Sequence, residues 1–149
     1  MDLSQYLEIF IDESKEHLQT LNDQVLILES EPENVDTVNE IFRAAHSLKG
    51  MAGTMGYKRM QRLTHDMENV FSEIRNGKMN VNADLVDIVF KCLDALEGYL
   101  TNIIETSDEG TEDNDELIAQ LNAVLQNGLA GSGEAQAAAT KEETKEEKK

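Results

Sequence analysis

Apolar residues recur at spacings of three and four along almost the whole of the first 125 residues. A helix has about 3.6 residues per turn, so this spacing places them on one face of successive α-helices. The only proline is Pro32, and it falls between two of the stripes, where it interrupts no helix. The pattern predicts an all-α chain with helices over residues 2–29, 35–53, 57–76, 82–106 and 113–126.

Four long amphipathic stripes suffice to surround one apolar core, so we predict an up-down four-helix bundle. The shorter fifth helix is an additional C-terminal element, and the sequence leaves open whether it docks on the bundle. From Asn127 onward, Gly, Ser, Ala, Thr, Glu and Lys dominate. This composition predicts a folded domain over residues 1–126 and a flexible polar linker over 127–149.

Glycine and asparagine mark the expected helix ends. Gly53 and Gly56 should terminate the second helix, with the break near Gly53. The pair Asn76-Gly77 has the form of a left-handed C-terminal cap for the third helix. Asn82 is suited to cap the start of the fourth.

The charge and cysteine content exclude several classes of function. A formal net charge of -17 repels nucleic acid phosphates and anionic membranes, so neither is an expected partner. No run of apolar residues approaches the ~18 needed to cross a bilayer, so membrane insertion is not expected. The single Cys92 cannot form an internal disulfide and is expected to fill core space. Together these features predict a cytoplasmic protein.

A basic segment stands out in this acidic chain. Residues 41–65 contain no Asp or Glu. A local positive field attracts phosphate groups and stabilises their charge, although clustered charges are often only a solvated surface. The segment holds His46, His65, Arg43, Lys49, Lys58, Arg59 and Arg62.

His46 is the first candidate functional residue. Helical spacing places Lys49, Gly50 and Gly53 around it. Glycine costs a helix about 1 kcal/mol relative to alanine, so Gly50 calls for an explanation, and bare backbone beside His46 would expose its ring. The plainer alternative is an ordinary surface histidine beside a frayed helix end.

His65 and Glu68, three residues apart, project from one polar edge of the third helix. If the second and third helices pack antiparallel, Glu68 can accept a hydrogen bond from His46 and leave the other ring nitrogen free as a nucleophile. Two histidines and a carboxylate are also the ligand set of an open zinc site. A non-catalytic helical adaptor is the third alternative.

Two segments carry a family resemblance. Residues 42–56 read Phe-Arg-Ala-Ala-His-Ser-Leu-Lys-Gly-Met-Ala-Gly-Thr-Met-Gly, and residues 63–69 read Leu-Thr-His-Asp-Met-Glu-Asn. The first resembles the phosphoacceptor motif of the N-terminal histidine-phosphotransfer (HPt) domain of CheA-type chemotaxis histidine kinases, and the second resembles another signature of that domain. The resemblance covers roughly residues 1–126.

The resemblance implies a role for each candidate residue. It implies that His46 is the phosphoacceptor, that Glu68 orients its imidazole, that Lys49 neutralises the phosphate and that His65 lines the site. It further implies that ATP and Mg²⁺ bind a separate CheA-type kinase domain, and that the receivers are aspartates of CheY-like and CheB-like response regulators. The domain itself then needs no cofactor, and whether it counts as an enzyme by itself stays open.

Overall fold

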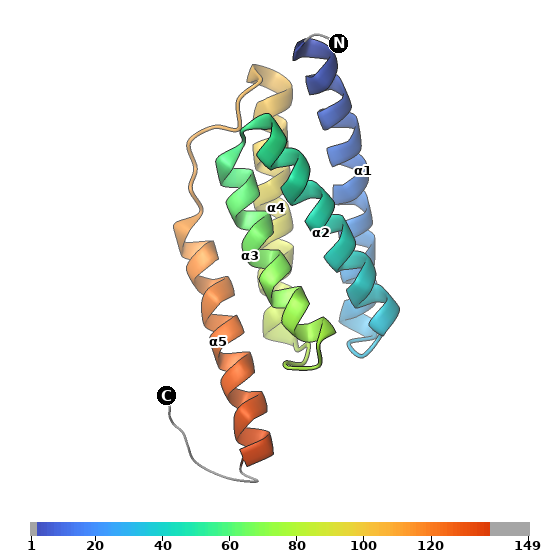
Figure 1. Ribbon diagram of the computed structural model, residues 1–149, viewed down its shortest axis with the longest axis vertical. Coiled ribbons are helices and arrows are strands. Elements are labelled where there is room, and N and C mark those ends of the chain that lie inside the picture. The colour runs from blue at the N-terminus through green and yellow to red at the C-terminus, as the bar shows by residue number, and fades with distance from the viewer. Residues whose placement is uncertain (1–2, 138–149) are drawn as a thin grey trace.

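The computed structural model describes residues 3–137, with side chains as far as residue 128. Within this range the chain is all-α, as predicted. The helices are α1 (Leu3–Ser30), α2 (Val35–Met55), α3 (Lys58–Arg75), α4 (Ala83–Thr106) and α5 (Asp115–Ala137). Figure 1 shows α1 to α4 running in alternating directions, which is the up-down bundle expected from the sequence.

Each bundle helix packs against two others in a closed ring. α1 contacts α2 and α4, and α3 contacts α2 and α4, so the four apolar faces meet in one core. α5 lies against α3 and α4 (Figure 1), where Ile118 and Leu121 are buried. The fifth helix therefore docks on the bundle, a point that the sequence left open.

The apolar stripes form the core. Burying a large aliphatic or aromatic side chain stabilises a fold by about 1.5–3 kcal/mol, so a core of this size dominates the stability of the bundle. Cys92 is fully buried within it, and burial together with the negative charge of Asp66 raises the pKa of its thiol to about 12. The largest fully buried side chains include Leu21, Leu28, Ile41, Leu48, Met60, Leu63, Met67, Phe71, Leu93, Leu96 and Tyr99.

Of the two glycines predicted to terminate the second helix, Gly56 does so, whereas the predicted break near Gly53 is not observed. α2 continues through Gly53 to Met55 and ends where Gly56 adopts φ 83°, in the left-handed region. Gly56 N–H donates to the Gly53 carbonyl at 3.1 Å, and Tyr57 N–H donates to the Ala52 carbonyl at 2.9 Å. A glycine inside a helix weakens it without changing its geometry, whereas a positive φ ends it.

The other two predicted caps are confirmed. At the end of α3, Gly77 has φ 78° and Lys78 N–H donates to the Glu73 carbonyl at 2.9 Å. At the start of α4, the Asn82 side-chain oxygen accepts from Leu85 N–H at 2.9 Å. These local hydrogen bonds satisfy backbone groups that the helix itself leaves unpaired.

The predicted linker was wrong for residues 127–137, which belong to α5. Extending a helix that is already docked is easier than starting one, and Leu, Ala, Glu and Gln are strong helix formers. The high helix propensity of these residues offsets the low propensity of the three glycines at 128, 131 and 133. Residues 138–149 of the predicted linker lie outside the described part of the chain.

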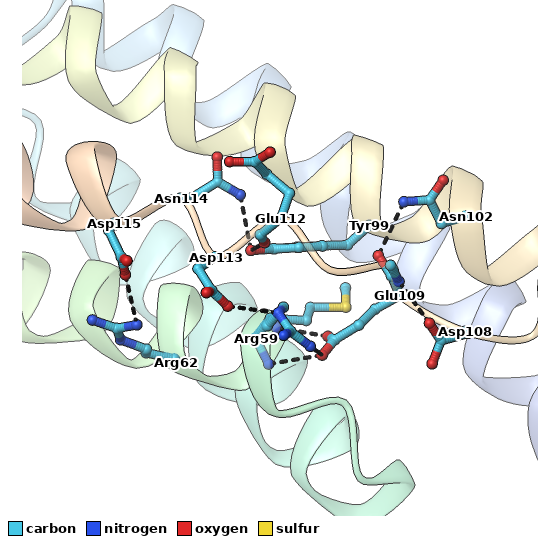
Figure 2. Close-up of polar contacts among 12 residues, drawn as sticks. Arg59, Arg62, Tyr99, Asn102, Asp108, Glu109, Glu112, Asp113, Asn114 and Asp115 are labelled. Carbon is cyan, nitrogen blue, oxygen red and sulfur yellow. Dashed lines mark hydrogen bonds and ion pairs between the residues drawn. The ribbon is translucent and has the colours of Figure 1, made fainter.

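The α4–α5 loop is fastened to the start of α3, as Figure 2 shows. The carboxylate of Glu109 accepts from Arg59 N–H at 3.0 Å and from Met60 N–H at 2.9 Å. Tyr99 Oη, on α4, donates to the Glu112 carbonyl at 2.6 Å. A buried carboxylate on the first backbone amides of a helix satisfies them and complements the helix dipole. Glu109 therefore helps to place α3, which carries part of the candidate site.

None of the helices in residues 3–137 has the length and hydropathy of a membrane span.

Candidate functional site

His46 on α2 and Glu68 on α3 face each other across the interface of these antiparallel helices. His46 Nδ1 is hydrogen-bonded to Glu68 Oε2. The imidazole is 62 % exposed, whereas the Glu68 side chain is only 9 % exposed. The site therefore combines a surface ring with a buried carboxylate. The exposed ring agrees with the expectation from the sequence, whereas Glu68, which was placed on a polar helix edge, is buried.

Lys49, one turn after His46 on α2, holds the other oxygen of the same carboxylate. Its Nζ donates to Glu68 Oε1 at 2.6 Å. Burial raises the pKa of Glu68, but the hydrogen bonds from Lys49 and His46 outweigh burial and hold that pKa below its ordinary value. Glu68 is therefore ionised at neutral pH and acts as the acceptor.

An ionised Glu68 fixes the tautomer of His46. The carboxylate can only accept, so Nδ1 carries the ring proton and donates it. In the neutral ring, the lone pair then resides on Nε2, for which no residue in the described part of the chain supplies a hydrogen bond. The ring thus presents an available nucleophilic nitrogen.

Phe42 and Arg75 also lie at the site, although neither was among the site residues predicted from the sequence. The Phe42 ring stacks on His46 with centroids 6.2 Å apart and planes 6° apart. The Arg75 guanidinium lies over the Phe42 ring, 4.3 Å from its centroid. Phe42 and His46 are four residues apart, a spacing that makes side chains neighbours on a helix, so the sequence contained a signal for this stack. Arg75 is at the end of α3, and its contact with Phe42 could be identified only from the packing of α3 on α2.

His65 does not join the other three predicted site residues. Its Nδ1 lies 3.2 Å from Asp66 Oδ1, and its side chain is 54 % exposed. It lines a shallow depression beside Lys49 instead. The two histidines therefore bind different carboxylates, and within the described residues no group of three or more His, Cys, Asp or Glu side chains is arranged to hold a metal ion. The zinc alternative is not supported by this geometry.

The basic segment is partly neutralised by acids that lie far away in the sequence. Arg59 pairs with Asp113 at 2.6 Å and Arg62 pairs with Asp115 at 3.0 Å (Figure 2). Both acids come from the α4–α5 connection and the first turn of α5. These ion pairs join residues more than 50 positions apart, and the sequence did not predict them.

Comparison with known proteins identifies the family. Residues 5–127 match the family model described as the Hpt domain. The chain is 53 % identical over 121 residues to the chemotaxis protein CheA of Bacillus subtilis, an alignment that covers 81 % of this chain and 18 % of that protein. The chain thus spans about a fifth of the length of this curated relative.

Solved structures agree with this assignment. A CheA phosphotransferase domain from Thermotoga maritima is 43 % identical with a TM-score of 0.67, over 70 % of this chain and 99 % of that one. A histidine phosphotransfer domain of CheA, solved in solution, is 36 % identical with a TM-score of 0.73, over 98 % of this chain and all of the other. The chain therefore belongs to the Hpt domain family.

Proposed function

We propose that this chain is the phosphoryl carrier of a chemotaxis signalling pathway, with His46 as the residue that is phosphorylated. The observation that carries the proposal is the exposed imidazole whose Nδ1–H is held by the ionised Glu68. Kinship with CheA phosphotransfer domains supports the same chemistry.

The first half of the reaction is attack on ATP. The Nε2 lone pair of His46 forms a bond to the γ-phosphorus, the bond from that phosphorus to the bridging oxygen breaks, and ADP leaves with the electron pair. The ring gains positive charge as the N–P bond forms. The Glu68 carboxylate on Nδ1–H stabilises that charge, as an orienting acid does for a catalytic histidine.

The second half returns the ring to its starting state. A carboxylate oxygen of a receiver aspartate bonds to the phosphorus, the N–P bond breaks, and its electrons return to Nε2. We assign the donor to a CheA-type kinase domain and the receivers to CheY-like and CheB-like response regulators. ATP and Mg²⁺ then bind those partners, this domain holds no cofactor, and all the components meet in the cytoplasm.

Lys49 and His65 have auxiliary roles in this proposal. The Lys49 ammonium donates one of its three protons to Glu68 and retains two for an incoming phosphate. His65 lines the adjacent depression, in contact with Asp66 rather than with the reacting ring. Lys49 therefore acts on both the carboxylate and the phosphate, while His65 shapes only the approach.

The test is phosphorylation in trans. The chain is incubated with γ-labelled ATP and a CheA-type kinase domain, and the label should be acid-labile and base-stable, as expected for phosphohistidine. His46→Gln should abolish labelling, whereas the matched control His17→Gln, on α1, should retain it. Label that survives in His46→Gln, or that has the stability of phosphoserine, would reject the proposal, and absence of label would favour an adaptor.

A further inference from the structure

The imidazole of His46 is restrained by two neighbours and not by Glu68 alone. Its hydrogen bond to Glu68 restrains the position of Nδ1. An imidazole moves by rotation about two side-chain bonds, and a hydrogen bond at one end of the ring restrains the tilt of the ring plane less tightly. Because the ring is 62 % exposed, general packing adds little to this restraint. A second specific contact is therefore needed to fix the direction in which Nε2 points.

Phe42 supplies this second contact. It lies one turn before His46 on α2, and the two ring planes are 6° apart with their centroids separated by 6.2 Å. This separation is within the range of offset-stacked aromatic pairs. A parallel neighbour resists tilting of the imidazole plane, which is the motion that the hydrogen bond restrains least. Phe42 is half-buried and packs against the bundle core, so its own position is well supported.

Arg75 in turn holds Phe42 from the neighbouring helix. Its guanidinium lies 4.3 Å from the centroid of the Phe42 ring, in a cation–π contact. No carboxylate among the described residues pairs with Arg75, although the chain carries 30 acidic residues. Glu68 and Arg75 are seven residues apart, about two helical turns, so they lie on the same face of α3. That face thus contacts His46 directly through Glu68 and indirectly through Arg75 and Phe42.

We propose that Phe42 and Arg75 are positioning residues for phosphoryl transfer at His46. Phe42 sets the plane of the imidazole, and Arg75 keeps Phe42 in place. The inference rests on the proposed function and adds to Glu68 a second restraint that aims the Nε2 lone pair. Bond formation requires this lone pair to point at the phosphorus, so a tilted ring slows the transfer step without weakening the binding of the partner.

Phe42→Leu is the first test, because it keeps an apolar side chain against the core but removes the aromatic face. It should lower kcat for phosphorylation by the kinase domain and ATP about two- to tenfold with KM unchanged, the equivalent of one aromatic pair. Phe42→Tyr retains the ring and should retain most of the parental kcat. Phosphoramidate is a small donor, whose P–N bond breaks with loss of ammonia as Nε2 bonds to phosphorus. It needs no alignment with a protein partner, so it should label the parent and Phe42→Leu equally.

Arg75→Gln is the second test, and it should lower kcat about two- to fivefold, the equivalent of one exposed cation–π contact. Arg75 is exposed, so this variant tests the inference even if Phe42→Leu does not fold. The matched control is Arg43→Gln, which removes the same charge from the residue next to Phe42, where Arg43 pairs with Glu40, and should leave kcat unchanged. Because Arg75 acts through Phe42, Arg75→Gln should have no further effect in the Phe42→Leu background.

The stack itself is measured without any labelling reaction, as an NOE between the ring protons of Phe42 and His46. This NOE should be present in the parent chain and weaker in Arg75→Gln, and its absence from the parent would overturn the inference. Parental kcat in both Phe42→Leu and Arg75→Gln, with His46 still labelled, would overturn the inference alone. A rise in KM at unchanged kcat would also overturn it, by assigning the two residues to contact with the partner. Slower phosphoramidate labelling of Phe42→Leu would do the same, since it would show altered reactivity of the ring. Absence of label at His46 in the parent would reject the proposed function as well.

Discussion

Lys49 and His46, one turn apart on α2, bind the two oxygens of a single carboxylate, that of Glu68 on α3. The carboxylate cannot rotate without losing one of these bonds, so the imidazole is held in one orientation although most of it is in solvent. A buried acid that serves two partners couples the position of the ring to the packing of α2 on α3. The reacting group is thus exposed and yet preorganised.

Glu68→Ala should slow phosphorylation of His46 by about 10- to 100-fold, the equivalent of one lost hydrogen bond to a charged group. The helical content should not change, because the substitution removes side-chain hydrogen bonds to His46 and Lys49 and leaves the apolar core of the bundle intact. The measurement is the initial rate of labelling by the kinase domain, with circular dichroism on the same samples. Asp66→Ala is the control, since Asp66 contacts His65 and not His46. Equal losses in both variants would contradict an orienting role for Glu68.

The stability that Glu68 contributes should depend on pH in a defined direction. Its pKa in the folded chain is below the ordinary value of 4.5. A carboxyl group with a lowered pKa stabilises the fold above its unfolded-state pKa, and this contribution is lost as the pH falls through the folded-state value. The difference in Tm between the parent chain and Glu68→Gln should therefore be largest near pH 7 and shrink below about pH 4.5. A difference that grows on acidification would contradict the direction of this shift.

Much of the fold and of the site could be read from local sequence patterns. The apolar stripes report helical periodicity directly, and Asn82 and Asn76-Gly77 form their caps with neighbours a few residues away. The pairing of His46 with Glu68 needed one further assumption, that successive helices pack antiparallel. These features depend on contacts between residues a few positions apart, so the order of residues in the sequence is enough to predict them.

The features that could not be predicted depend on long-range packing. Glu109, Asp113 and Asp115 reach the start of α3 from the α4–α5 connection and the first turn of α5, about 50 residues later in the chain. His65 was predicted to line the site, and it lies beside Lys49 but contacts Asp66 rather than His46, because two residues on one edge of a helix need not reach the same neighbour. The predicted end of α2 was two residues early for a different reason. The sequence gives the positions of Gly53 and Gly56 but does not show which of them adopts a positive φ.

Gly50 and Gly56 should respond to alanine with opposite signs. Gly50 is inside α2 with open space around it, so Gly50→Ala should stabilise the chain by about 0.5–1 kcal/mol. Gly56 has φ 83°, so Gly56→Ala should destabilise it by about 1–2 kcal/mol. Midpoints of urea unfolding at unchanged slope measure both effects. Changes of the same sign would show that α2 does not end at Gly56 as described.

Glu109→Ala should destabilise the chain by about 1–3 kcal/mol, because two backbone amides at the start of α3 lose their acceptor. Urea unfolding measures the loss, and hydrogen exchange should accelerate at the Arg59 and Met60 amides. Glu112→Ala is the matched control from the same loop. The contact of Glu112 with Tyr99 uses its backbone carbonyl, which the substitution retains, so its effect should stay within about 0.5 kcal/mol. If Glu109→Ala and Glu112→Ala reduced the free energy of unfolding equally, non-specific attraction of the negative loop to α3 would explain the contact, and the hydrogen bonds of Glu109 would not.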